Sequence, residues 1–395
     1  MTMFRLGLPR TVIILGLVSF LNDAASEMIT PLLPIFLTAA LGAGPAIVGL
    51  VEGVAEATAS LLKLVSGRLV DRGWRAKRLV LGGYGVSNLA RPLIGLALGW
   101  PWVLLLRFLD RLGKGLRTAP RDALIAGAVE EHRRGLAFGV HRALDHAGAV
   151  VGPLMAFGLL SAGVPLGEVF LWSVIPGLLV ILLLVFGLPR DAGLALPGAP
   201  VPPLRWSLLD RRLRGLILAA GTLALVAVPE VFLVLWAHDR GLEVQWVPLL
   251  WAAASAVKML VVAPMSALSD RWGRVPTLAI GWSLRLAVLI VLALSGLDSS
   301  MPLTLGLFLA YAAALASTEG AERALIGDRA PIEVRGTAFG LYHMVSGLAA
   351  LPGAVLFGVI WEVVGASAAF GVAALVSAVT LGLFVRRARQ AGDRP

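Results

Sequence analysis

Acidic side chains recur at helical spacing in the first part of the chain. Asp23 and Glu27 lie one helical turn apart, and Glu52 and Glu56 repeat that spacing. Residues at this spacing share one face of a helix. A carboxylate that loses a neighbouring cation gains affinity for a proton, so such a group can couple proton movement to another event. The residues that we predict to couple protons are Asp23, Glu27, Glu56, Asp110, Asp145 and His146.

Basic side chains form a stripe further along the chain. Arg107, Arg111, Lys114 and Arg117 follow one another at steps of three or four residues, and Arg121 continues the series. The stripe can balance the acids in a static ion-pair network, or it can bind a carboxylate or phosphate, for which arginine is suited. The residues that we predict to bind substrate are Asn22, Glu52, Arg107, Arg111, Lys114, Arg117, Glu230, Lys258 and Tyr311.

The elements that carry these charges are strongly apolar. The chain of 395 residues is 58% hydrophobic and 15% charged, whereas a soluble protein is about half apolar and about a quarter charged. A bilayer core requires about 20 apolar residues per helix, and twelve segments meet this length. We therefore predict an all-α membrane protein with twelve transmembrane helices. The segments are 12–38, 45–69, 79–99, 101–125, 136–161, 168–188, 213–237, 245–268, 277–297, 302–326, 337–361 and 366–386.

Arginine and lysine are concentrated in alternate connections between these segments. The opposite connections contain almost none, with Arg240 as the exception. The positive-inside rule then places both termini in the cytoplasm of a multi-pass protein of the cytoplasmic (inner) membrane. The same rule accounts for the net charge of +10, so we expect no nucleic-acid partner. The first apolar segment contains Asp23 and Glu27, and we expect a retained helix rather than a cleaved signal peptide.

Several function classes lack their sequence signatures. The chain has no cysteine, which removes disulfides, thiolate metal sites and cysteine nucleophiles. The HExxH, GxSxG and P-loop patterns are also absent from the sequence. We therefore expect no enzyme activity, no cofactor and no metal site. The partners that we expect are a small-molecule substrate, protons and the lipid bilayer, and the protein is expected to be a monomer.

The two halves of the chain repeat one another. The hexamer that begins at Arg134 (RGLAFG) recurs at Arg335 (RGTAFG), and Leu69-Val70-Asp71-Arg72 has a counterpart that ends in Asp270-Arg271. Each match falls at the same position among the predicted helices, which argues for duplication of a six-helix unit. We predict an N-terminal bundle at 1–188, a proline-rich cytoplasmic linker at 189–212 and a C-terminal bundle at 213–395. Parallel six-helix halves are typical of alternating-access transporters.

Two motifs resemble the major facilitator superfamily. The first is Gly67-x-Leu69-x-Asp71-Arg72 between the second and third helices, which departs from the family pattern in having Gly73 next. The second, Gly139-(x)8-Gly148-(x)3-Gly152-Pro153, resembles the signature of the antiporters of that superfamily. The resemblance is strongest to the proton-coupled drug-efflux branch and its uncharacterised prokaryotic relatives. It implies a conformational role for Gly67, Asp71, Arg72, Arg75, Asp122, Gly139, Gly148, Gly152, Pro153, Asp270, Arg271 and Glu322.

These observations predict a secondary active transporter. The first half carries the charged stripes, whereas the helix around Tyr311 is apolar, so we expect a charged wall for coupling and an apolar wall for binding. The favoured function is a proton-coupled antiporter that exports an organic or amphiphilic small molecule by alternating access. The alternative is a transporter of a small anionic solute or a lysolipid that uses the basic face of the fourth helix.

Overall fold

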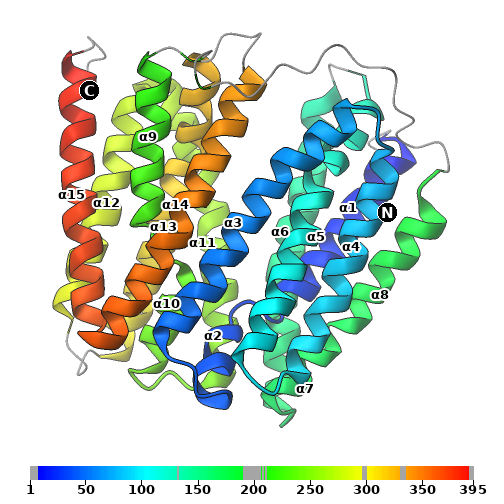
Figure 1. Ribbon diagram of the computed structural model, residues 1–395, viewed down its shortest axis with the longest axis horizontal. Coiled ribbons are helices and arrows are strands. Elements are labelled where there is room, and N and C mark those ends of the chain that lie inside the picture. Colours follow the sequence, from blue (N-terminus) through cyan, green and yellow to red (C-terminus); the bar gives the residue numbers. More distant parts are fainter. Residues whose placement is uncertain are drawn as a thin grey trace. The chain divides into compact units, whose positions relative to one another are not determined.

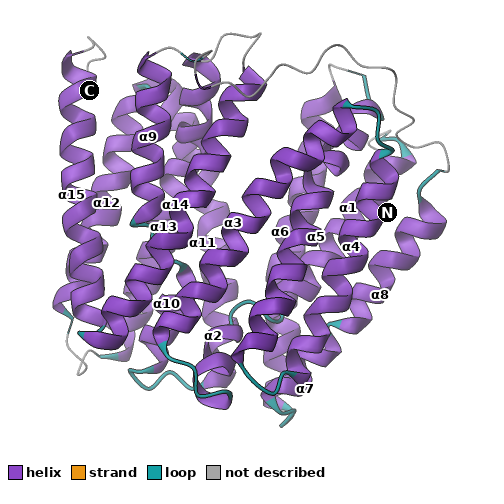
Figure 2. Cartoon of the chain, viewed as in Figure 1, coloured by secondary structure: helices purple, strands orange, loops and turns teal. Residues whose placement is uncertain are grey.

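The computed structural model describes residues 8–130, 133–189, 206, 209, 211–295, 300–329 and 335–390. The regular secondary structure of these residues is helical throughout, without a strand (Figure 2). The chain divides into two compact units. Unit 1 comprises Met1–Phe36 and Thr58–Val201, and unit 2 comprises Leu37–Ala57 and Pro202–Pro395. Most of the predicted linker at 189–212 lies outside the described residues.

Unit 1 is built from helices that run alongside one another (Figure 1). One long helix, α3, is continuous, and its residues up to Ala57 belong to unit 2. The helices of unit 1 are α1 (Arg10–Glu27), α2 (Leu33–Ile35), the second half of α3 (Pro45–Asp71), α4 (Ala76–Leu93), α5 (Trp100–Gly127), α6 (Arg134–Ser161), α7 (Leu166–Trp172) and α8 (Val174–Leu182). Short 3-10 and π-helical turns continue α2, α4 and α8.

Unit 2 contains the remaining helices, together with the first half of α3. They are α9 (Arg211–Leu225), α10 (Glu230–His238), α11 (Val247–Trp272), α12 (Arg274–Leu294), α13 (Met301–Arg329), α14 (Arg335–Val363) and α15 (Ala366–Gln390).

All twelve predicted segments are helical, which confirms the predicted fold class. Nine stretches of the described residues are long and apolar enough to cross a membrane. The other three predicted segments contain α1, α4 and α5, each of which carries at least three charged side chains within its length. Charge inside a membrane helix is costly and therefore marks functional positions.

Three of the predicted segments are not single helices. The segment at 168–188 divides into α7 and α8 at Ser173. α1 ends at Glu27, and the chain continues through α2 after Pro31. The segment predicted at 213–237 is broken between α9 and α10, and Pro229 stands directly before α10. Proline explains the break, because it removes a backbone donor and disrupts the preceding turn. The Tyr311 hydroxyl donates a hydrogen bond of 2.9 Å to the Val228 carbonyl in this break.

Equivalent helices pack together in the two units. In unit 1, α1 packs against α6 and α4 packs against α5. In unit 2, α9 packs against α14 and α12 packs against α13. These pairs have the same order within their halves, so the structure supports the duplication that the repeated sequences predicted.

Candidate functional site

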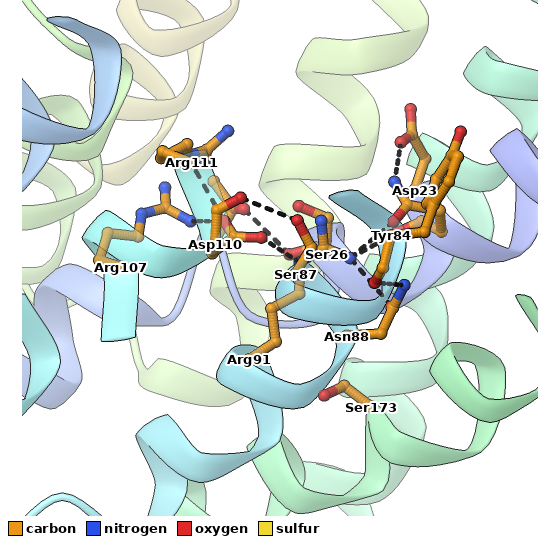
Figure 3. A network of polar contacts seen from close by, with 12 residues as sticks. Asp23, Ser26, Tyr84, Ser87, Asn88, Arg91, Arg107, Asp110, Arg111 and Ser173 are labelled. Atoms are coloured by element: carbon orange, nitrogen blue, oxygen red, sulfur yellow. Dashed lines mark hydrogen bonds and ion pairs between the residues drawn. The ribbon is translucent and has the colours of Figure 1, made fainter. Parts of the chain in front are cut away.

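The Asp110 carboxylate lies at the centre of a buried arginine cluster in unit 1. Arg91 of α4 donates from Nε to Asp110 Oδ1 at 2.8 Å. Arg107 and Arg111, which flank Asp110 on α5, each approach Asp110 Oδ2 to 3.5 Å. Figure 3 shows Asp110 among these three arginines. The Asp110 side chain is 0% exposed, and this arrangement favours the static ion-pair role for Asp110 over proton coupling.

Arg91 also joins α1 to the cluster. Its Nη1 donates to Asn22 Oδ1 at 2.9 Å and to Asn88 Oδ1 at 3.3 Å (Figure 3). Ser87 donates to the Asp110 carbonyl at 2.8 Å and accepts a hydrogen bond of 2.8 Å from Arg117 Nη1. Three helices of unit 1 are therefore fixed to one another by polar side chains. Buried polar groups of this kind must be satisfied, because an unpaired one is costly.

Glycines allow α4 and α5 to come close enough for these bonds. A Cβ on Gly113 would lie 2.3 Å from the Gly83 carbonyl oxygen, and one on Gly83 would lie 2.6 Å from the Gly113 carbonyl oxygen. No side chain fits at either position without moving the backbone of the other helix. Small residues at helix interfaces serve this purpose in membrane proteins.

A second cluster brings carboxylates of α1 and α6 together. Asp23 is half-buried and accepts a hydrogen bond of 3.1 Å from Asn22. The Asp145 carboxylate of α6 acts electrostatically on Asp23, and two like charges close together oppose ionisation of both groups. The Lys114 and Arg117 cations of α5 and the Glu27 carboxylate act electrostatically on Asp23.

Further charged side chains act on the Asp145 end of this pair. Arg142 Nη1 lies 3.5 Å from Asp145 Oδ2, and Arg121 and His141 act on Asp145 electrostatically. His141 is buried and lies 2.9 Å from the Ser19 hydroxyl, whereas the neighbouring His146 is exposed on α6. The structure thus brings Asp23 and Asp145 together with the cations of α5 and leaves His146 outside that contact.

The glycines of the antiporter-like motif hold α6 against α1. A Cβ on Gly148 would lie 2.2 Å from the Phe20 carbonyl oxygen, and a Cβ on Gly152 would lie 2.4 Å from that of Ala24. Two glycines four residues apart share one face of a helix, and this face lies close to α1. Gly139, by contrast, has no atom near the position that its Cβ would occupy. Pro153 is buried inside α6.

Unit 2 contains a smaller group of polar and aromatic side chains. Lys258 of α11 donates to Glu230 Oε2 at 2.7 Å, and its Nζ lies 5.6 Å from the centre of the Trp251 ring. Tyr311 is fully buried, and the Glu230 carboxylate acts electrostatically on its hydroxyl group. The predicted substrate-binding residues of this half, Glu230, Lys258 and Tyr311, therefore gather around the break between α9 and α10.

The second copy of the loop motif forms an ion-pair cluster. Arg274 pairs with Asp270, donates to Ser269 at 2.7 Å and reaches Asp328 of α13 at 3.0 Å. Arg271, the motif arginine, is exposed. The cluster ties the ends of α11, α12 and α13 together.

The first copy of the motif is arranged differently. Arg72 and Arg75 are exposed, Gly67 is half-buried and the Asp71 side chain lies outside the described residues. Asp122 pairs with its neighbour Arg121 at 2.9 Å.

The remaining predicted residues belong to unit 2. Glu52 and Glu56 are on the part of α3 that belongs to unit 2, where Glu52 is half-buried and Glu56 is exposed. Glu322 of α13 accepts hydrogen bonds of 3.1 Å from Trp282 and from Tyr342. These contacts join α12 and α14 to α13 within unit 2.

The sequence interpretation missed the polar face of α4. Tyr84, Ser87, Asn88 and Arg91 follow one another at helical spacing and all four are buried. That spacing within an otherwise apolar segment was visible in the sequence and would have predicted a polar face. The Arg117 guanidinium lies 4.5 Å from the centre of the Tyr84 ring, which adds a cation–π contact to the cluster.

Comparisons with known proteins agree with this architecture. A family model described as Major Facilitator Superfamily matches residues 15–351, with a second match at 252–395. An uncharacterised MFS-type transporter of Methanocaldococcus jannaschii is 30% identical over 365 residues, which cover 90% of this chain and 89% of that protein. Multidrug resistance protein MdtH of Photorhabdus laumondii is 33% identical over 134 residues, or 34% of this chain and 33% of that protein.

A solved structure shows the same fold. A POT family transporter in complex with 5-aminolevulinic acid has a TM-score of 0.82 and 12% identity, and the match covers 97% of this chain and 96% of that chain. The helices, their repeated packing and the family match lead to one conclusion: the chain belongs to the major facilitator superfamily of membrane transporters.

Proposed function

We propose that this transporter is a proton-coupled antiporter that exports an organic or amphiphilic small molecule by alternating access. The observation that carries the proposal is the electrostatic interaction between the Asp23 carboxyl group of α1 and the Asp145 carboxyl group of α6. Two adjacent carboxylates disfavour ionisation of both, so such a pair binds a proton that it can later release. The partial match to a multidrug resistance protein supports export of an organic solute.

The cations of α5 supply the coupling step in this proposal. Lys114 and Arg117 act on Asp23, and Arg121 acts on Asp145. If a conformational change or a bound solute moves a cation towards the pair, the ionised form is favoured and the proton leaves. If the cation moves away, the pair takes up a proton. Proton release and solute movement are then linked without any covalent chemistry.

The proposal also includes the membrane, the oligomeric state and the orientation of the protein. We propose a monomer in the cytoplasmic membrane. Both termini would lie in the cytoplasm, because the basic connections, with the exception of Arg240, fall on one predicted side. Outward export of solute would then use the inward proton gradient of such a membrane.

The test begins with purified protein and a panel of organic solutes screened by thermal shift, since a ligand stabilises the folded state by mass action. A solute that binds is loaded into liposomes, and its flux is measured with and without a pH gradient. Asp23→Asn should abolish flux driven by the gradient and leave counterflow largely intact. Glu243→Gln, which removes an exposed carboxylate from a loop of unit 2, is the matched control.

Two outcomes would contradict the proposal. Normal gradient-driven flux in both Asp23→Asn and Asp145→Asn would remove these residues from coupling. Flux that responds to an anion gradient and never to pH would instead favour the second candidate, transport of a small anionic solute or a lysolipid along the basic face of α5. That candidate is supported by the cations Lys114 and Arg117. They follow Arg111 along α5, whereas the α5 arginines that contact Asp110 are Arg107 and Arg111.

A further inference from the structure

Arg285 of α12 is a buried arginine whose donors are incompletely used. The residue is 6% exposed. Two of its three side-chain nitrogens, Nε and Nη2, are buried and have no hydrogen-bond partner among the described residues. A guanidinium stays charged in proteins and can only donate. Burying such donors without acceptors is costly, so the position calls for an acceptor that the described chain does not provide.

The two open nitrogens indicate the shape of that acceptor. The Nε–H bond and the adjacent Nη2–H bond point in the same direction from one edge of the planar guanidinium. This edge matches the two oxygens of a carboxylate or phosphate and forms two charge-assisted hydrogen bonds with it. A single water or a carbonyl oxygen would not satisfy both donors as well. The missing acceptor is therefore best matched by an oxyanion group.

The surroundings of Arg285 suit an organic anion. Arg285 and Glu230 both act electrostatically on the buried Tyr311 of α13. Glu230 is bound by Lys258, which lies near the Trp251 ring. Arg285 and Lys258 are two cations in this group, whereas Glu230 is its single carboxylate. One positive charge is therefore not balanced within the group. An aromatic surface is also present, because the ring centres of Trp251 and Phe308 lie 6.4 Å apart.

The repeat explains how Arg285 comes to lack an acid. The register that aligns Arg134 with Arg335 also aligns Asp110 with Tyr311, so unit 2 has a phenol where unit 1 has its central carboxylate. Arg285 therefore acts electrostatically on Tyr311, the residue that stands where unit 1 has the Asp110 carboxylate.

The packing of the two units supports this alignment. A Cβ on Gly83 of α4 would lie 2.9 Å from Arg117 Cβ, and a Cβ on Gly281 of α12 would lie 2.5 Å from Thr318 Cγ2. Thr318 is the residue that the register aligns with Arg117. Arg285 follows Gly281 by one helical turn, as Ser87 follows Gly83, and the Ser87 hydroxyl contacts Asp110.

We propose that Arg285 binds the carboxylate or phosphate group of the transported solute and that this solute is an aromatic or apolar organic anion. The inference rests on the proposed transport function and specifies its substrate class. Binding at Arg285 is measured without any gradient, so it can fail or succeed independently of proton coupling at Asp23.

The test uses the purified full-length protein in a phosphate-free detergent buffer, with affinity measured by calorimetry and thermal shift. The probes are phenylacetate and phenyl phosphate, with 2-phenylethanol and phenethylamine as neutral and cationic counterparts. Inorganic phosphate and phosphatidylglycerol test a free ion and a lipid headgroup as the source of the oxyanion. The variants are Arg285→Gln and Arg285→Lys, and Arg386→Gln, which removes an exposed cation from α15, is the matched control.

We expect the two organic oxyanions to bind and their neutral and cationic counterparts to bind at least about tenfold more weakly. Arg285→Gln should weaken phenylacetate binding about tenfold or more. The affinity of Arg285→Lys should lie between those of the parent protein and Arg285→Gln, because an ammonium keeps the charge but cannot present two parallel donors. Arg386→Gln should bind as the parent protein does. If Arg285→Gln does not fold, the probe series and Arg285→Lys still decide the question.

Three results would overturn the proposal. The first is equal affinity of the parent protein for phenylacetate and 2-phenylethanol. The second is unchanged phenylacetate binding in Arg285→Lys or Arg285→Gln. The third is binding of inorganic phosphate or phosphatidylglycerol alone, which would assign the site to an ion or a lipid headgroup rather than to a transported solute.

Discussion

Arg91 of α4 donates a hydrogen bond of 2.8 Å to the Asp110 carboxylate of α5, and the Asp110 side chain is 0% exposed. The same guanidinium reaches Asn22 of α1. One arginine thus connects three helices of unit 1 through a single buried carboxylate. The first prediction concerns what happens when that carboxylate is removed.

Asp110→Asn should strongly destabilise the protein. Loss of the carboxylate leaves the Arg91, Arg107 and Arg111 cations buried without their shared counter-ion. Breaking a buried pair in this way costs about 3–5 kcal/mol. Thermal unfolding of the purified protein measures the loss, and Glu243→Gln, at an exposed loop position, should be within about 0.5 kcal/mol of the parent. Equal melting temperatures for Asp110→Asn and the parent protein would contradict the central role of Asp110.

Gly148→Ala should displace α6 from α1. The added Cβ would lie 2.2 Å from the Phe20 carbonyl oxygen, so one backbone must move, at a cost of about 1–3 kcal/mol. Gly158→Ala is the matched control in the same helix, because nothing lies within 4 Å of its Cβ position. That control should be neutral or slightly stabilising, since alanine favours helix over glycine by up to about 1 kcal/mol. A similar melting temperature for the two variants would argue against close packing at Gly148.

Glu230 and Lys258 should be energetically coupled. Their side chains are 20% and 29% exposed and lie 2.7 Å apart, so part of the ion-pair energy survives solvent screening. A double-mutant cycle with Glu230→Gln and Lys258→Met should give a coupling energy of about 0.5–1 kcal/mol. The four melting temperatures supply the measurement, and strictly additive effects would show that the pair contributes nothing to stability.

Asp239→Asn should stabilise the protein at neutral pH. Burial raises the pKa of the Asp239 carboxyl above its ordinary value, while His238 and Arg240 act in the opposite direction. The folded state then binds the proton more tightly than the unfolded chain does. The resulting stability is fully present below the unfolded pKa of about 3.9 and is lost as pH rises through the higher folded pKa.

The effect of this substitution should therefore depend on pH. Asparagine resembles the protonated form and also removes a negative charge from the C-cap position of α10, where the helix dipole disfavours it. The melting temperature of Asp239→Asn should exceed that of the parent at pH 7, and the difference should shrink as the pH falls towards about 4. Glu243→Gln in the same loop should show no such trend, and a constant difference at every pH would refute the assignment.

Several features of this structure could be read directly from the sequence. Nine of the helical segments follow from apolar length alone, and the bend after α1 follows from Pro31. The contact of Gly148 and Gly152 with α1 follows from their spacing, because two glycines one turn apart leave a flat face on a helix. In each case the signal lies within one segment of the chain.

Other features depend on how helices are rotated against one another, and no segment contains that information alone. The contact of Arg91 with Asp110 depends on the approach of Gly83 to Gly113. The electrostatic interaction between Asp23 and Asp145 depends in the same way on how α1 and α6 lie against one another. The position of Pro229 in the seventh segment is visible in the local sequence. The partner of the Val228 carbonyl in the break is not, because that partner is the Tyr311 hydroxyl of a helix far along the chain.

The break between α9 and α10 has a consequence for biosynthesis. α10 has nine residues, far fewer than the about 20 needed to cross a bilayer, so it can enter the membrane only together with α9. The Val228 carbonyl between them is satisfied by Tyr311, which lies 83 residues further along the chain. The ribosome therefore has to make α11, α12 and the first part of α13 before this carbonyl finds its donor. The seventh membrane segment is completed only after the tenth has been synthesised, which ties the assembly of unit 2 to the order of translation.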